Sequence, residues 1–106
     1  MKVILNNIIP FGGYTAINLF GVMFAKTKPN DRTIRHESIH TKQMKELLYV
    51  PFYLWYVIEW FIKLFPNKFN SHNAYRSISF EREAYENEGY LDYLNNRKKY
   101  SWLKYL

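Results

Sequence analysis

Residues 31–48, DRTIRHESIHTKQMKELL, contain the pattern on which the expected fold is built. Their apolar side chains recur at the three- and four-residue intervals that place side chains on one face of a helix. These side chains are Ile34, Ile39, Met44, Leu47 and Leu48. Asn30 and Asp31 come just before the pattern and offer a helix N-cap. The sequence therefore predicts an amphipathic helix over residues 31–48, with one face in the core.

A five-residue motif, His36-Glu37-Ser38-Ile39-His40, lies inside this helix. Side chains four positions apart share a helix face, so the imidazoles of His36 and His40 can hold one metal ion. The carboxylate of Glu37 is then close enough to a metal-activated water to act as general base. The competing interpretation is a chance pair of surface histidines, but the chain has only three His residues. The motif predicts a metal centre with His36 and His40 as ligands and Glu37 as catalytic base.

The N-terminal third has the composition of a small sheet. Residues 3–9 are β-branched and aliphatic, which is typical of a strand, and residues 14–20 and 21–26 form one interrupted strand or two. A turn is expected between the first two strand segments, at Pro10, Gly12 and Gly13. We expect an antiparallel β-sheet within residues 1–29.

Further helices follow the metal-binding helix. Pro51 suits the first turn of a second helix that runs to about Phe65. A third, long helix is expected from residues 71–73 to about Leu94, and residues 96–106 form a basic aromatic tail. The fold class is therefore α+β, with a small antiparallel sheet followed by three or four helices and the HExxH motif on the first of them.

Composition limits the kind of protein. The 106 residues suffice for one domain, and 10 Tyr, 8 Phe and 3 Trp supply large side chains for its core. Cysteine is absent, so disulfides and Cys-ligated metal sites are excluded. The net charge of +6 suits an anionic membrane surface or nucleic acid, but charge alone is a weak indication and nucleic acid is not the expected partner. The first 13 residues lack a long apolar run, so no signal peptide is predicted.

A catalytic zinc site needs a third protein ligand. Gln43 and Glu46 stand where a metzincin would have Gly and His, so that arrangement is excluded. A carboxylate on a later helix and His72 both remain as candidates.

The combination of HExxH with a downstream Glu81-x-x-Ala84 resembles the gluzincin clan of zinc peptidases. The segment FEREA, which contains these two residues, is similar to the prenyl-protein endopeptidase and HtpX-like branch, and the chain length resembles the minigluzincins. The resemblance covers roughly residues 21–86. It implies that His36, His40 and Glu81 bind Zn²⁺, and that Ala84 lets the Glu81 helix approach the metal helix.

The resemblance also implies a strand just before the metal helix that pairs with an extended peptide, and residues 21–26 occupy that position. The branch usually has Asp directly after the Ala, as a partner for a ligating His, whereas this chain has Tyr85. Glu88 and Asn73 are candidate substitutes. Glu83 competes with Glu81 for the third ligand, but the two lie about 200° apart around a helix, so only one can face the metal.

Two other roles stay open. The candidates for donating a hydrogen bond to the oxyanion are His72, Tyr75 and Tyr85. The tail after Asn95 offers a segment that could fold over the metal and keep an enzyme latent.

Residues 47–65 are strongly apolar, and three locations are compatible with them: a buried core helix, which we favour, an interfacial membrane helix, or a membrane span. Glu59 and Lys63 lie one turn apart on the side of Tyr56, and we expect that side to face water or to snorkel. Residues 47–65 and the basic tail are candidates for peripheral membrane contact, and the expected location is cytoplasmic or membrane-associated.

These observations predict one zinc-peptidase-like domain over residues 1–106. It divides into a sheet (1–29), a helical metal-binding core (30–95) and a tail (96–106). The expected function is zinc-dependent hydrolysis of peptide bonds in a peptide or protein substrate. The alternatives are a zinc-binding domain without catalysis, and a basic membrane-surface or nucleic-acid-binding protein in which the motif is a coincidence.

Overall fold

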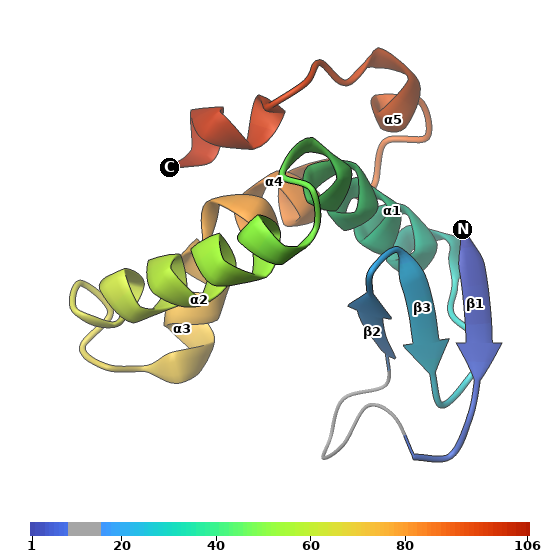
Figure 1. The fold of residues 1–106 in the computed structure, drawn as a ribbon, viewed down its shortest axis with the longest axis horizontal. Coiled ribbons are helices and arrows are strands. Elements are labelled where there is room, and N and C mark those ends of the chain that lie inside the picture. Colours follow the sequence, from blue (N-terminus) through green and yellow to red (C-terminus); the bar gives the residue numbers. More distant parts are fainter. Residues whose placement is uncertain (9–15) are drawn as a thin grey trace.

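The structure, a computed structural model, describes residues 1–8 and 16–106. It confirms an α+β fold, in which a three-stranded sheet is followed by helices (Figure 1). The strands are β1 (Lys2–Leu5), β2 (Ala16–Leu19) and β3 (Val22–Ala25), in the order β1-β3-β2. The turn expected at Pro10, Gly12 and Gly13 lies outside the described residues.

The sheet is mixed, so the expected antiparallel sheet is wrong in this detail. β2 and β3 form an antiparallel hairpin whose turn residues, Phe20 and Gly21, have φ values of 53° and 89°. β1 pairs with β3 and not with its sequence neighbour β2, and β1 and β3 run in the same direction. β2 lies beside helix α1 (Asp31–Glu46), where the amide of Asn18 donates to the carbonyl of Glu37 at 2.8 Å. β1 pairs with the edge of β3 that β2 does not occupy.

The helix boundaries follow from local capping. The side chain of Asn30 accepts the backbone N–H of Thr33 at 2.8 Å and so begins α1. Leu48 and Tyr49 have φ values of 58° and 68°, which interrupt the helical backbone between α1 and α2 (Val50–Leu64). The two helices meet at 111°.

The long helix expected from residues 71–73 to Leu94 is divided. α3 (Ser71–Ser77) and α4 (Ser79–Asn87) are separated by Ile78, which has an extended backbone, and α5 (Tyr93–Asn96) and a 3₁₀ helix, η1 (Ser101–Tyr105), follow. The carboxylate of Glu59 on α2 accepts the N–H of Ser79 at 2.5 Å and its hydroxyl at 2.6 Å. A side chain from another helix therefore caps α4, which local sequence patterns do not reveal.

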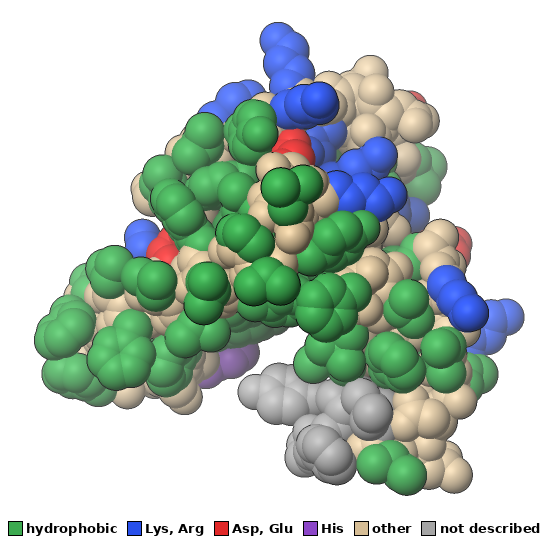
Figure 2. All heavy atoms as spheres, viewed as in Figure 1, with side chains coloured by type: hydrophobic (Ala, Val, Ile, Leu, Met, Phe, Trp, Pro, Cys, Tyr) green, Lys and Arg blue, Asp and Glu red, His purple; other side chains and the backbone are tan. Residues whose placement is uncertain are grey.

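Glu59 also corrects the expected orientation of α2. Only 5% of Glu59 is exposed, so the side that carries it faces the interior and not water. The outward side is apolar, and Figure 2 shows hydrophobic side chains spread over this face of the molecule. Among the described residues, no single helix has the length and hydropathy of a membrane span, although α1 and α2 meet those criteria as a bent pair.

Replacing Glu59 by Ala should destabilise the protein by about 1–3 kcal/mol, because three hydrogen-bond donors, two of them on the fully buried Ser79, lose their acceptor. The donors are the N–H and hydroxyl of Ser79 and the indole of Trp55. Urea unfolding followed by far-UV circular dichroism measures the loss. Glu86→Ala, on the exposed side of α4, is the matched control and should change stability by less than about 0.5 kcal/mol. Equal stability of Glu59→Ala and the control would contradict this account of the cap.

The tail belongs to the core. Trp102 is 2% exposed and packs against Phe80, with ring centroids 4.8 Å apart, and against Trp55 at 5.1 Å. The core cluster around it consists of Met44, Phe52, Ile78, Phe80 and Trp102. α4 is thus held between α1 on one side and η1 on the other, which positions its side chains toward α1.

Candidate metal centre

Three potential ligand atoms converge between α1 and α4. The Nε2 atoms of His36 and His40 are 3.1 Å apart, and Oε1 of Glu81 lies 3.1 Å from the first and 3.0 Å from the second. All three residues are at most 7% exposed. Ala84 is fully buried on α4, where its small side chain permits the close approach of the two helices. The structure therefore brings together the three residues that the sequence predicts as ligands.

Gln43 fixes the tautomer of His40. Its Nε2 donates to the carbonyl of Phe80 at 3.1 Å and to Oε1 of Glu83 at 3.0 Å, and both partners can only accept. Oε1 of Gln43 must therefore face Nδ1 of His40, 2.7 Å away, as an acceptor. Nδ1 of His40 then carries the proton, and its Nε2 presents a lone pair to the cluster.

His36 and Glu81, the other two potential ligands, are also oriented by hydrogen bonds with neighbouring side chains. Oε2 of Glu88 lies 3.0 Å from Nδ1 of His36, so Glu88 takes the orienting role and Asn73, which is exposed, does not. The hydroxyl of Tyr56 donates to Oε2 of Glu81 at 2.6 Å and leaves Oε1 for the cluster. Each potential ligand thus has one partner that orients it, as in established metal sites.

The donor set fits a divalent metal ion. Tetrahedral Zn²⁺ with bonds of about 2.0–2.1 Å separates its ligand atoms by about 3.3–3.4 Å, slightly more than the 3.0–3.1 Å found here. Two imidazole lone pairs and a carboxylate facing one another require a positive charge between them. In the absence of a metal, a proton on His40 supplies this positive charge. Burial opposes the charge on His40, but Glu81 raises the pKa of His40 to about 10. Burial likewise opposes the charge on Glu81, yet the two histidines keep its pKa well below the ordinary value.

Glu37 lies beside the three ligands without joining them. Its Oε2 is 3.9 Å from Nε2 of His36, and ligand atoms of His36, Glu37 and His40 all lie within 4.8 Å of one another. Burial raises the pKa of Glu37, although the neighbouring histidines act in the opposite direction. A carboxylate with a raised pKa, next to the open side of a metal site, has the properties of a general base.

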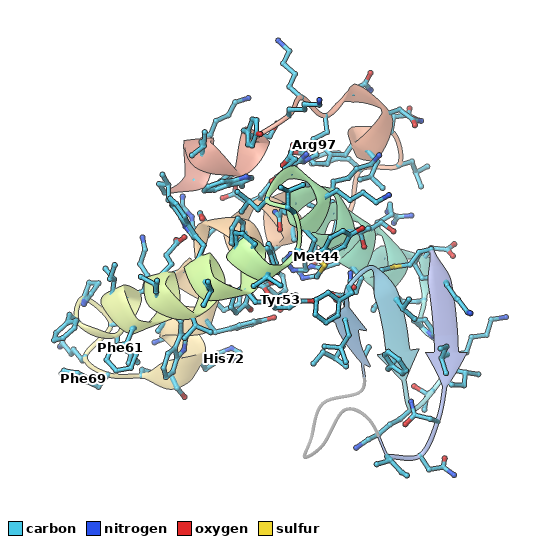
Figure 3. The ribbon with its side chains drawn as sticks, in the orientation of Figure 1. Met44, Tyr53, Phe61, Phe69, His72 and Arg97 are labelled. Carbon is cyan, nitrogen blue, oxygen red and sulfur yellow. The ribbon has the colours of Figure 1, made fainter. Side chains whose placement is uncertain are left out.

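A cleft of about 410 Å³ opens at the cluster. Glu37, His40 and Glu81 lie in its wall, together with β2 residues 16–19 and apolar or aromatic side chains of α1, α2 and α3. Tyr53, which reaches from α2 toward the hairpin in Figure 3, accepts the N–H of Phe20 at 2.9 Å and so joins the two walls. Among the described strands, β2 is the edge strand next to the cleft and β3 is central, so the expectation that residues 21–26 form the strand that pairs with a peptide is wrong.

The three candidates for donating a hydrogen bond to the oxyanion differ in their position relative to the cleft. Tyr75 lines both the cleft that holds Glu37 and Glu81 and a neighbouring cavity of about 480 Å³, whereas His72 and Tyr85 line only the neighbouring cavity. Burial and the charge of Glu81 raise the pKa of Tyr75, so this hydroxyl stays protonated. It is 2.9 Å from the hydroxyl of Tyr85.

Glu83, the alternative third ligand, points away from the imidazoles. Its Oε2 accepts from Nε of Arg97 at 2.5 Å and from the hydroxyl of Tyr93 at 2.6 Å. Arg97 also contacts both carboxylate oxygens of Glu46 at 3.0 Å. No described residue after Glu81 lines the cleft, and Trp102 of the tail packs against Phe80, so the structure does not support the idea that the tail covers the metal.

Two orienting residues, Gln43 and Tyr56, are missing from the sequence-based site. The spacing of Gln43 indicates its orienting role, because Gln43 lies three positions after His40 and seven after His36, on the same helix face. The sequence around Tyr56 gives no indication of its orienting role, because nothing local distinguishes it from the other nine tyrosines. Comparisons of the chain with protein-family models, curated proteins and solved structures gave no match.

Proposed function

We propose that this protein is a zinc-dependent metallopeptidase. The observation that carries the proposal is the convergence of three buried ligand atoms, each oriented by its own partner, beside a free carboxylate in an open cleft. A structural metal site normally has four protein ligands, whereas three ligands and an adjacent base are typical of hydrolytic sites.

The residues divide the work of hydrolysis among them. His36, His40 and Glu81 would hold the ion, which would supply Lewis acidity toward the scissile carbonyl and toward water. Glu37 accepts the proton from the attacking water and afterwards delivers it to the leaving amine. The hydroxyl of Tyr75 is the favoured hydrogen-bond donor to the oxyanion.

An extended peptide is the substrate class that suits the cleft. β2 presents the backbone groups of an edge strand along one wall, and such an edge binds a peptide by strand addition. Met44, Phe52 and Tyr53 line the cleft near His40, so apolar substrate side chains are expected there.

Metal content tests the site directly. Protein purified without a histidine tag or chelator should contain about one zinc per chain by elemental mass spectrometry. His36→Ala and Glu81→Gln should lose the metal, while Glu86→Gln on the exposed side of the same helix should keep it. A metal-free wild type that takes up no added zinc would overturn the proposal.

A further inference from the structure

Helix α2 turns an apolar face outward. The side chains of this face share exposed fractions between 41% and 65%. They are Val50, Leu54, Trp55, Val57, Ile58, Phe61, Ile62 and Phe65. At 100° per residue they span about 160° of the helix circumference without a polar or charged member. This set is called the apolar face of α2 below.

The polar groups of α2 point the other way. Tyr56 donates to Glu81, Glu59 accepts from Ser79, and the indole of Trp60 donates to the carbonyl of Ser71 at 3.1 Å. A helix on a water-exposed surface normally has the opposite arrangement, with its apolar stripe inward. The apolar face of α2 is thus suited to a non-aqueous neighbour, and contiguous exposed apolar surface of this kind marks interaction sites.

Burial of the acidic residues makes the surface more cationic than the net charge suggests. All charged residues belong to the described part of the chain, and of nine acids only Asp31, Glu86 and Asp92 are exposed. Ten of the fifteen Lys and Arg residues are exposed. A surface of this charge complements anionic lipid head groups.

Lysines lie at the margin of the apolar face. Lys68 stands between two exposed aromatic residues, Phe65 and Phe69, at the end of α2. Lys104 stands on η1 next to Leu103, which is 48% exposed, and η1 borders α2 through the Trp55–Trp102 contact. Figure 2 shows Lys and Arg side chains along the upper margin of the hydrophobic face.

We propose that the apolar face of α2 docks onto the surface of an anionic phospholipid bilayer, with the helix parallel to the membrane. The 15 residues of α2 extend over about 22 Å, which is shorter than the hydrocarbon thickness of about 30 Å and suits an interfacial position. Trp55, at the border of the face, is the kind of residue that accumulates at this interface. The proposal goes beyond peptidase activity and does not depend on the metal.

The test is flotation of the full chain with vesicles of phosphatidylcholine alone, or of phosphatidylcholine and phosphatidylglycerol in equal parts. The protein should float with the anionic vesicles and bind neutral ones at least about tenfold more weakly. Phe61→Glu should weaken binding at least about tenfold, because it places a charge within the face. Leu91→Glu is the matched control, since Leu91 is also an exposed apolar residue (78%, against 60% for Phe61) but lies outside the face, and it should bind like wild type.

Two further measurements make the result decisive. Tryptophan emission should shift to shorter wavelength on anionic vesicles, and Trp55→Phe should remove most of the shift. His36→Ala should bind vesicles like wild type, which separates this proposal from the metal site. Absence of vesicle binding, or equal binding by wild type and Phe61→Glu, overturns the proposal. A dimer in solution that Phe61→Glu converts to a monomer, without vesicle binding, assigns the face to a second copy of the chain and overturns it as well.

Discussion

Replacing Glu37 by Gln is expected to lower the rate of peptide hydrolysis by a factor of about 10² to 10⁴ while zinc content stays at the wild-type level. Gln has nearly the same shape as Glu but cannot accept the proton of the attacking water. The three ligand atoms are contributed by other residues, so the ion should remain bound. Cleavage of a quenched fluorescent peptide library, with zinc measured on the same preparations, checks both halves of this prediction.

The alternatives give different results in that experiment. Loss of zinc in Glu37→Gln would make Glu37 a ligand and contradict its assignment as base. Equal cleavage by wild type and Glu37→Gln would exclude Glu37 from catalysis. Zinc binding without any cleavage by the wild type would favour the non-catalytic zinc-binding domain.

Replacing Arg97 by Ala is expected to destabilise the protein by about 3–5 kcal/mol, because two buried carboxylates lose their counter-ion. The side chains of Arg97, Glu46 and Glu83 are at most 8% exposed. Burial opposes the charge on Glu83, but hydrogen bonds from Arg97, Tyr93 and Gln43 keep its pKa below the ordinary value. Urea unfolding of the metal-free protein measures the loss, and Lys98→Ala, at an exposed neighbouring position, should leave stability unchanged.

Arg97→Ala should also lower the affinity of the site for zinc. Arg97 holds Glu83, Glu83 accepts from Gln43, and Gln43 orients His40. Gln43→Leu interrupts this chain at its last step and should lower zinc affinity about 10- to 100-fold in competition with a chelator. Arg97→Lys, which keeps the charge but not the fork of donors, should recover part of the stability and affinity lost in Arg97→Ala. Wild-type zinc affinity in folded Gln43→Leu would show that this hydrogen-bond chain has no influence on the ion.

Local patterns predict much of this molecule, and tertiary contacts account for what they miss. The spacing of His36 and His40 and the periodicity of residues 31–48 suffice to predict α1, because both depend on neighbours within one or two helical turns. The division at Ile78 is accompanied by the contact of Ser79 with Glu59, twenty positions earlier, and the pairing of β1 with β3 joins Lys2 to Val22, also twenty positions apart. The outward apolar face of α2 reverses the usual relation of polarity to burial, so the side that carries Glu59, expected to face water or to snorkel, is the buried one.

The position of Arg97 in the chain has a consequence for biosynthesis. Arg97 follows His40 by 97 − 40 = 57 positions, and Trp102 comes five positions later still. While α1, α2 and α4 leave the ribosome, Glu46 and Glu83 have no counter-ion and Phe80 lacks the indole that covers it. A nascent chain that has not reached residue 102 therefore lacks two of the side chains that pack against α4, and we expect the candidate metal centre to assemble only after synthesis has passed that point.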